Sequence, residues 1–210
     1  MSKFLLRKIL LFLIVIGIFA SATDAQTAPA AGEVKKGKPP IIIIPGLAGT
    51  ELVNTKSQEV VWFKAGRSKD DDLRLPISPN LRQNRDSLVP KDIIRSVQIV
   101  RFLPEIEIYE RLIDALEKRG GYKEGKLDAP PADGHQDTFY VFPYDWRYDN
   151  VENARLLIRK ISALKTKLKK PNLKFNIIAH SMGGLLSRYA AMYGDADLPR
   201  NGRPRPTWAG

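Results

Sequence analysis

The chain has 210 residues, of which 43% are hydrophobic and 27% are charged, and it contains no cysteine. This composition is that of an ordinary globular protein, and the length fits one domain with a sizeable core or part of a larger domain. The formal net charge of +11 favours contact with anionic surfaces. The basic residues are scattered, however, and no nucleic-acid-binding motif accompanies them. We therefore interpret the charge as a solvated surface and expect no nucleic-acid partner.

Residues 1–25 have the pattern of a secretory signal peptide. Lys3, Arg7 and Lys8 precede an unbroken apolar run at residues 9–20, and small residues suited to cleavage follow it. The run is shorter than the ~20 residues that span a bilayer, so cleavage is favoured over a membrane anchor. The sequence thus predicts an exported protein, secreted or periplasmic, that keeps no transmembrane segment after cleavage and uses no disulfides.

Residues 26–39 are rich in alanine, lysine, glycine and proline and are interpreted as a linker. Four consecutive isoleucines at residues 41–44 show no alternation, as expected of a parallel strand that is buried on both faces. A glycine-rich turn follows at residues 45–49. Residues 53–104 combine charged and proline-rich pieces, typical of solvated loops, with short apolar anchors. We interpret that segment as a lid or an insertion.

The rest of the chain alternates between helices and strands. Apolar residues at helical spacing predict a helix over residues 105–119, which two glycines end. A strand is expected at residues 137–142, a second helix at residues 151–169 and a further strand at residues 173–179. This order predicts an α/β fold with a parallel sheet and right-handed crossovers.

The last predicted strand runs directly into Ala179-His180-Ser181-Met182-Gly183, and a helical pattern follows. A serine between an apolar strand and a helix, with a small residue two positions away on each side, is typical of a nucleophile elbow. The start of the helix supplies unpaired N–H groups and a positive dipole end, which both suit a developing oxyanion. Ser181 is therefore the predicted catalytic nucleophile. The alternative is a serine in an ordinary buried turn.

Two backbone N–H groups are candidates for an oxyanion hole. In an α/β-hydrolase one donor comes from the loop after an early strand, and the other belongs to the residue after the nucleophile. The corresponding residues are Leu47 and Met182, with Gly46 beside the substrate because glycine lets the backbone approach a ligand closely. The alternative for residues 45–49 is a simple tight turn at the end of a strand.

The run Pro-Tyr-Asp-Trp-Arg at residues 143–147 follows the middle strand. Ligands of open parallel sheets bind outside the carboxyl ends of the strands, so this run is expected to border the same crevice as the nucleophile. Tyr144 and Trp146 are candidates for lining an acyl pocket. Asp145 and Arg147 are expected to pair with each other, and a structural role is favoured over a catalytic one.

Together these motifs resemble the lecithin:cholesterol acyltransferase family, which also includes lysosomal-type phospholipases. The resemblance covers the chain from about residue 40 onward and is carried, in order, by Pro45-Gly46-x-x-Gly49-x-x-Leu52, by Pro143-Tyr144-Asp145-Trp146-Arg147 and by Ala179-His180-Ser181-Met182-Gly183. The helix pattern from Tyr109 to Tyr122 is also similar to that family. The resemblance implies an α/β-hydrolase fold and a serine acyl-enzyme mechanism on lipid esters at a membrane or micelle surface, without a cofactor.

The sequence departs from the family's pattern at two points. Animal members close a lid with a disulfide, whereas a lid within residues 53–104 of this chain would be held by packing alone. A hydrolase triad runs in the order Ser, Asp or Glu, then His, yet no histidine follows Ser181. We therefore expect residues 40–210 to be the N-terminal part of a hydrolase domain that is incomplete at its C-terminus, and the 210-residue chain alone to be inactive.

Neither histidine of the sequence fits the role of the missing base. His180 adjoins the nucleophile and is expected to point away from it, in a supporting role. His135 lies in the loop before the middle strand and precedes the nucleophile, which leaves it as a minor alternative. Two distant histidines and no cysteine also give no metal-ligand cluster, so no metal ion is expected.

Two other functions are consistent with the same residues. The first is a secreted triacylglycerol lipase or carboxylesterase that shares only the hydrolase scaffold. The second is an inactive, truncated chain that at most binds lipid.

Overall fold

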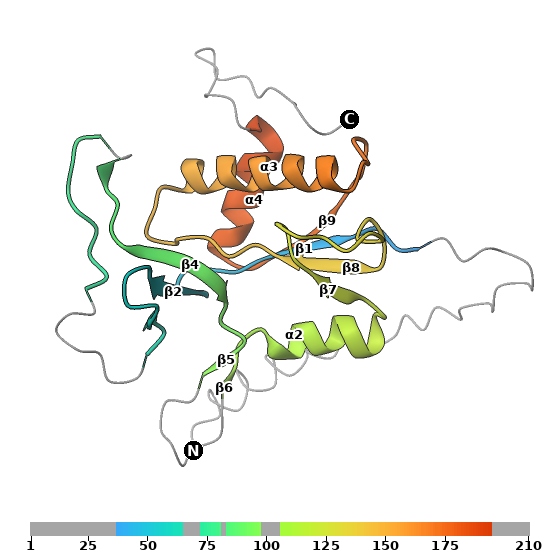
Figure 1. Ribbon diagram of the computed structural model, residues 1–210, viewed down its shortest axis with the longest axis horizontal. Coiled ribbons are helices and arrows are strands. Elements are labelled where there is room, and N and C mark those ends of the chain that lie inside the picture. Colours follow the sequence, from blue (N-terminus) through green and yellow to red (C-terminus); the bar gives the residue numbers. More distant parts are fainter. Residues whose placement is uncertain (1–36, 65–71, 81–82, 98–105, 195–210) are drawn as a thin grey trace, which may run out of the picture. The chain divides into compact units, whose positions relative to one another are not determined.

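Figure 1 shows the computed structural model, in which the described residues are 37–64, 72–80, 83–97 and 106–194. The predicted signal peptide, most of the predicted linker and part of the predicted lid lie outside these ranges. None of the helices within the ranges is long and apolar enough to cross a membrane.

A four-stranded parallel sheet with the strand order β7-β8-β1-β9 forms the centre of the structure (Figure 1). In this order the strands are β7 (Lys123–Gly125), β8 (Thr138–Val141), β1 (Ile41–Ile44) and β9 (Asn176–Ala179). The predicted α/β arrangement with a parallel sheet is confirmed, and β1, β8 and β9 lie where strands were expected. Strand β7 was not predicted, because three residues, two of them exposed, are too few to show a period.

Helices cover both faces of this sheet (Figure 1). They are α2 (Glu110–Asp114), which continues as the π-helical segment η2 (Ala115–Arg119), α3 (Asn150–Lys167) and α4 (Met182–Tyr193). Ile42 and Ile44 pack in the cluster that contains side chains of α3 and α4, whereas Ile41 and Ile43 pack in the cluster that contains Ile113 of α2. All four isoleucines are at most 5% exposed. Burial on both faces is the reason why β1 shows no alternation.

A second, antiparallel sheet with the order β3-β2-β4 follows β1 in the sequence. Its strands are β2 (Thr50–Asn54), β3 (Val60–Trp62) and β4 (Leu88–Ile93), and a short ladder of β5 (Ser96–Val97) and β6 (Ile106–Glu107) comes after it. Within residues 53–104 the sequence predicted no strand, whereas β3, β4 and β5 form there; the interpretation of this segment as a lid or an insertion stays a prediction. The strands are short, and β4 carries Pro90, Lys91 and Asp92 in its middle, so the sequence shows no clear strand period.

Helix α2 begins later than the expected residue 105, and the cause is a hydrogen-bond arrangement from outside the segment. The carbonyl oxygen of Arg95 accepts from the backbone N–H groups of Ile108, Tyr109 and Glu110 at 2.8 to 3.1 Å. These three amides therefore bond to the residue that precedes β5 and not to the carbonyl groups of a preceding helical turn. Helix α3 starts close to its predicted position because the Asp149 side chain accepts from the N–H of Val151 at 2.8 Å, as an N-cap does.

An ion-pair network joins the two sheets. The Arg147 guanidinium, after β8, lies 2.7 Å from a carboxylate oxygen of Asp145 and 2.5 Å from one of Asp86, which precedes β4. The predicted pair between Asp145 and Arg147 is therefore confirmed. Burial alone lowers the pKa of Arg147, but the hydrogen bonds and charges of Asp145 and Asp86 outweigh burial and raise it. The side chains of Arg147 and Asp145 are only 4% and 1% exposed, so each needs the other's charge.

We predict that Arg147→Met destabilises the protein by about 3–5 kcal/mol, because it leaves the Asp145 carboxylate buried without its cation. The free energy of unfolding in urea measures the effect. Lys118→Met is the matched control, since the Lys118 side chain is 71% exposed and lies 2.7 Å from Asp114; its loss should stay below ~1 kcal/mol. Equal losses in the two variants would contradict a structural role for the network.

Candidate active site

Ser181 occupies the turn between β9 and α4. Its backbone has φ 49° and ψ −121°, a conformation that residues other than glycine rarely adopt. The residue is exposed, and its side chain makes no capping hydrogen bond to the helix. A strained serine with a free hydroxyl at the start of a 12-residue helix has the conformation expected of a nucleophile elbow.

The elbow lies directly against the turn that follows β1. A β-carbon on Gly183 would lie 2.5 Å from the carbonyl oxygen of Pro45 and 2.7 Å from that of Ile44. A β-carbon on Gly46 would lie 3.2 Å from the Ser181 β-carbon. Backbone contacts therefore restrict position 183 to glycine by space, whereas a β-carbon at position 46 would require Ser181 and His180 to shift slightly. The predicted need for a small residue two positions after the serine is explained by this contact.

Two backbone amides of the turn after β1 have no hydrogen-bond partner among the described residues. The N–H of Gly46 donates to the Tyr109 hydroxyl at 2.8 Å, and the N–H of Gly49 donates to the Gly46 carbonyl at 3.0 Å. The amides of Leu47 and Ala48, between them, remain available. The turn contacts the elbow, so these amides and Ser181 lie at the same end of the sheet, beyond the carboxyl ends of β1 and β9.

The start of α4 offers a third such amide. The N–H of Gly183 donates to the His180 carbonyl at 2.9 Å, and that of Gly184 donates to the Ser181 carbonyl at 2.8 Å. The N–H of Met182 has no partner within the described ranges, as expected for the first residue of a helix. The predicted donors Leu47 and Met182 thus carry available amides, and their function in an oxyanion hole stays a prediction.

Tyr144 bonds to the turn after β1, and Trp146 bonds to the first residue of β2. Tyr144 is fully buried, and its hydroxyl donates to the Pro45 carbonyl at 3.0 Å. Trp146 is half-buried, lies edge-on to Trp62 at 5.5 Å between ring centroids, and donates from its indole N–H to the Thr50 carbonyl at 3.4 Å. These contacts are structural. A role of either side chain in an acyl pocket stays a prediction.

Tyr109 is the residue at this site that the sequence reasoning missed. Its hydroxyl accepts from the Gly46 N–H at 2.8 Å and lies 3.0 Å from Nδ1 of His180. Burial raises the pKa of the Tyr109 hydroxyl, and the hydrogen bond from Gly46 offsets part of that shift, so the group is protonated at neutral pH. Its apolar neighbours gave it the pattern of an ordinary core residue, and no local signal marks a contact 71 residues away.

Neither histidine is positioned as a general base for Ser181. His180 is exposed and directs Nδ1 to Tyr109. His135 precedes the amino end of β8, whereas Ser181 follows the carboxyl end of β9. Because the strands are parallel, these two residues lie at opposite ends of the strands, His135 at the amino ends and Ser181 at the carboxyl ends. The minor alternative of His135 as the base is therefore not supported by its position.

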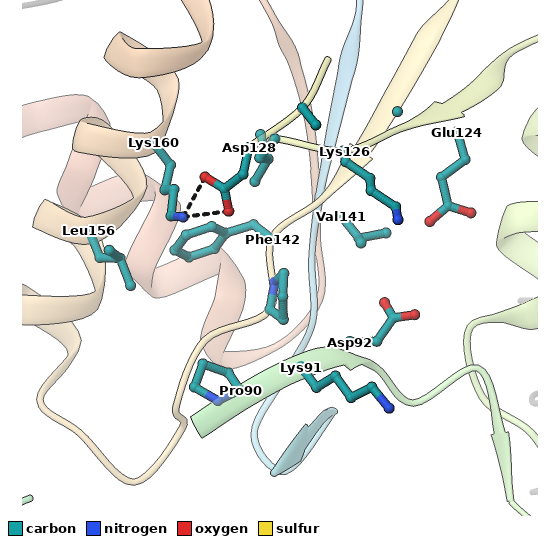
Figure 2. A pocket seen from close by; sticks show the side chains of 14 residues that line it. Pro90, Lys91, Asp92, Glu124, Lys126, Asp128, Val141, Phe142, Leu156 and Lys160 are labelled. Carbon is teal, nitrogen blue, oxygen red and sulfur yellow. Dashed lines mark hydrogen bonds and ion pairs between the residues drawn. The ribbon is translucent and has the colours of Figure 1, made fainter. Parts of the chain in front are cut away.

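A cavity of about 650 Å³ opens at the carboxyl ends of β7 and β8 (Figure 2). Phe142 and Leu156 form apolar parts of its wall, and Lys160 pairs with Asp128 across one side at 2.7 Å. None of the predicted site residues lines it. The cavity and the elbow thus share the carboxyl side of the sheet but are separate features of it.

Comparison with known proteins gives one match. Residues 102–195 match the family model of lecithin:cholesterol acyltransferase. The match includes the run at residues 143–147 and the elbow at Ser181, and it confirms the resemblance over that part of the chain. It indicates an enzyme of the class that transfers or hydrolyses lipid acyl groups. Neither a curated protein nor a solved structure matched the chain.

We predict that Gly183→Ala lowers the free energy of unfolding by about 1–3 kcal/mol, because the added methyl group would overlap two carbonyl oxygens. Gly184→Ala is the control on the same helix. A β-carbon there meets nothing within 4 Å, so the change should be neutral or stabilise by up to ~1 kcal/mol. Chemical unfolding of both variants provides the comparison, and a neutral Gly183→Ala would contradict the close approach.

Proposed function

We propose that the chain belongs to an exported enzyme that transfers or hydrolyses the acyl group of lipid esters through a serine acyl-enzyme. The observation that carries the proposal is the elbow: Ser181 is exposed and strained, and it touches a turn with available amides. The match to the acyltransferase family over residues 102–195 supports the choice of lipid esters. We further propose that residues 40–210 are the N-terminal part of an α/β-hydrolase domain, and that residues 1–25 are a cleaved signal peptide.

In this mechanism the Ser181 hydroxyl attacks the carbonyl carbon of the ester while its proton passes to a general base. The negative charge on the tetrahedral oxygen is stabilised by the N–H groups of Leu47 and Met182. Collapse of the intermediate breaks the bond to the alcohol oxygen, which takes up the proton held by the base, and leaves the acyl group on Ser181. A lipid alcohol or water then takes the acyl group by the reverse sequence of steps.

The base is a requirement of the proposal that the described residues do not meet. Nδ1 of His180 is engaged with Tyr109, and His135 lies at the opposite ends of the strands. Without a base, a serine hydroxyl is a weak nucleophile at neutral pH. Activity should therefore be measured on the complete gene product.

We predict that Ser181→Ala in the complete protein lowers the turnover of p-nitrophenyl butyrate by about 10⁴-fold or more. Ser187→Ala is the matched control: this serine lies on the same helix, and its hydroxyl donates to the Gly184 carbonyl at 3.0 Å. The control should keep turnover within about twofold, because a hydroxyl that bonds only to its own helix does not act on the transition state. Retained turnover in Ser181→Ala would refute the assignment of the nucleophile.

The acyl acceptor separates the proposal from its nearest alternative. Vesicles of phosphatidylcholine with a sterol or a lipid alcohol supply both an acyl donor and an acceptor other than water. Formation of the acylated alcohol supports an acyltransferase. Release of free fatty acid alone supports the alternative, a secreted lipase or carboxylesterase.

A further inference from the structure

The Tyr109 hydroxyl stands between the two halves of the candidate active site. On one side it accepts the Gly46 N–H at 2.8 Å, and on the other it lies 3.0 Å from Nδ1 of His180. A hydroxyl has one proton and two lone pairs. Since Gly46 uses a lone pair, the proton is available for Nδ1, and we assign the donor role to the hydroxyl. The ring of His180 then carries its own proton on Nε2.

The ring of Tyr109 packs in the core, whereas its hydroxyl makes polar contacts at the candidate active site. The ring packs in the buried cluster formed with Ile43, Ile113 and Phe139, and the residue is only 7% exposed. The hydroxyl lies outside this cluster and against the turn, where a β-carbon on Gly49 would lie 3.0 Å from the hydroxyl oxygen. Replacement by phenylalanine would therefore keep the packing and remove only the bridge.

The other side-chain hydrogen bonds to the turn go to carbonyl groups, whereas Tyr109 bonds to the Gly46 amide. The Trp62 indole N–H donates to the Ala48 carbonyl at 2.8 Å, and the Tyr144 hydroxyl donates to the Pro45 carbonyl. Both of these bonds hold carbonyl groups. Tyr109 alone holds an amide of the turn by a side chain, among the described residues, and it is also the only one of the three that reaches the elbow.

We propose that Tyr109 is a positioning residue for acyl transfer: its hydroxyl occupies the Gly46 amide and ties it to His180, which aims the neighbouring Leu47 amide at the oxyanion. This inference rests on the proposed function. It explains why the first amide of the turn is unavailable to a ligand while the second is free. It also gives the helix of residues 110–119 a role at the active site, because Tyr109 is its N-cap residue.

The physical reason is the angular demand of an oxyanion hole. A donor contributes only when its N–H points to the position that the charged oxygen takes in the transition state. The Gly46–Leu47 peptide has no β-carbon on its glycine side to limit its rotation. A hydrogen bond to the Gly46 amide restricts this freedom before the substrate arrives, which is the preorganisation that such sites need.

The test uses the complete protein with Tyr109→Phe and with Tyr140→Phe as the matched control. Tyr140 is also fully buried, and its hydroxyl donates to the Gly134 carbonyl at 2.7 Å, in the loop before β8. Each variant thus loses one buried phenol hydroxyl. The readouts are kcat and KM for p-nitrophenyl butyrate and the inhibition constant of butylboronic acid, which forms a tetrahedral adduct with an active-site serine.

For Tyr109→Phe we expect kcat to fall about tenfold or more with KM changed less than twofold, because the bridge acts on the transition state rather than on substrate binding. The inhibition constant of the boronic acid should rise by a similar factor. Tyr140→Phe should leave all three quantities within twofold of the wild type. His180→Ala breaks the other end of the bridge at an exposed position and should also lower kcat without changing KM.

Two results would overturn the inference, and they are distinguishable. Equal kinetic constants for Tyr109→Phe and Tyr140→Phe, in an enzyme whose turnover depends on Ser181, would overturn the role of Tyr109 alone. Wild-type turnover that survives in Ser181→Ala would overturn the proposed function together with this inference.

Discussion

The close approach between the turn after β1 and the elbow after β9 is the contact on which the candidate site depends. Two neighbouring parallel strands deliver these segments to the same end of the sheet. Glycine at 183 is required by this approach, and glycine at 46 lets the turn lie close to Ser181 and His180. The contact brings the serine and the available amides to the same end of the sheet. A site that stabilises charge by backbone amides needs such an approach, because the donors cannot reach out as side chains do.

The surrounding structure serves mainly to keep this contact in place. Burial of β1 on both faces fixes the start of the turn, and aromatic side chains bond its peptide groups from the second sheet, from α2 and from the segment after β8. The network around Arg147 attaches the second sheet to the first. The polar groups of these aromatic side chains bond to backbone groups of the turn, and the Tyr109 hydroxyl also bonds to His180, so they rigidify the turn without leaving a buried donor unpaired.

Sequence reasoning succeeded where the signal is local. The isoleucines of β1, the amphipathic face of α3 and the strand–serine–helix order can each be recognised within a window of about 11–18 residues. It failed where structure depends on distant partners: Arg95 delays the start of α2, β7 forms only by pairing with β8, and the antiparallel sheet consists of short strands with a weak period. Tyr109 was missed for the same reason, since its hydroxyl matters only through Gly46 and His180, which are remote in sequence.

Covalent labelling shows directly whether Ser181 is the nucleophile. A fluorophosphonate reacts with a serine that has a working base and oxyanion hole, and peptide mass spectrometry then locates the adduct. We predict that the complete protein is labelled in the tryptic peptide that contains Ser181, and that Tyr140→Phe is labelled at the wild-type rate. An adduct on any other residue, or no adduct in a protein that turns over esters, would contradict it.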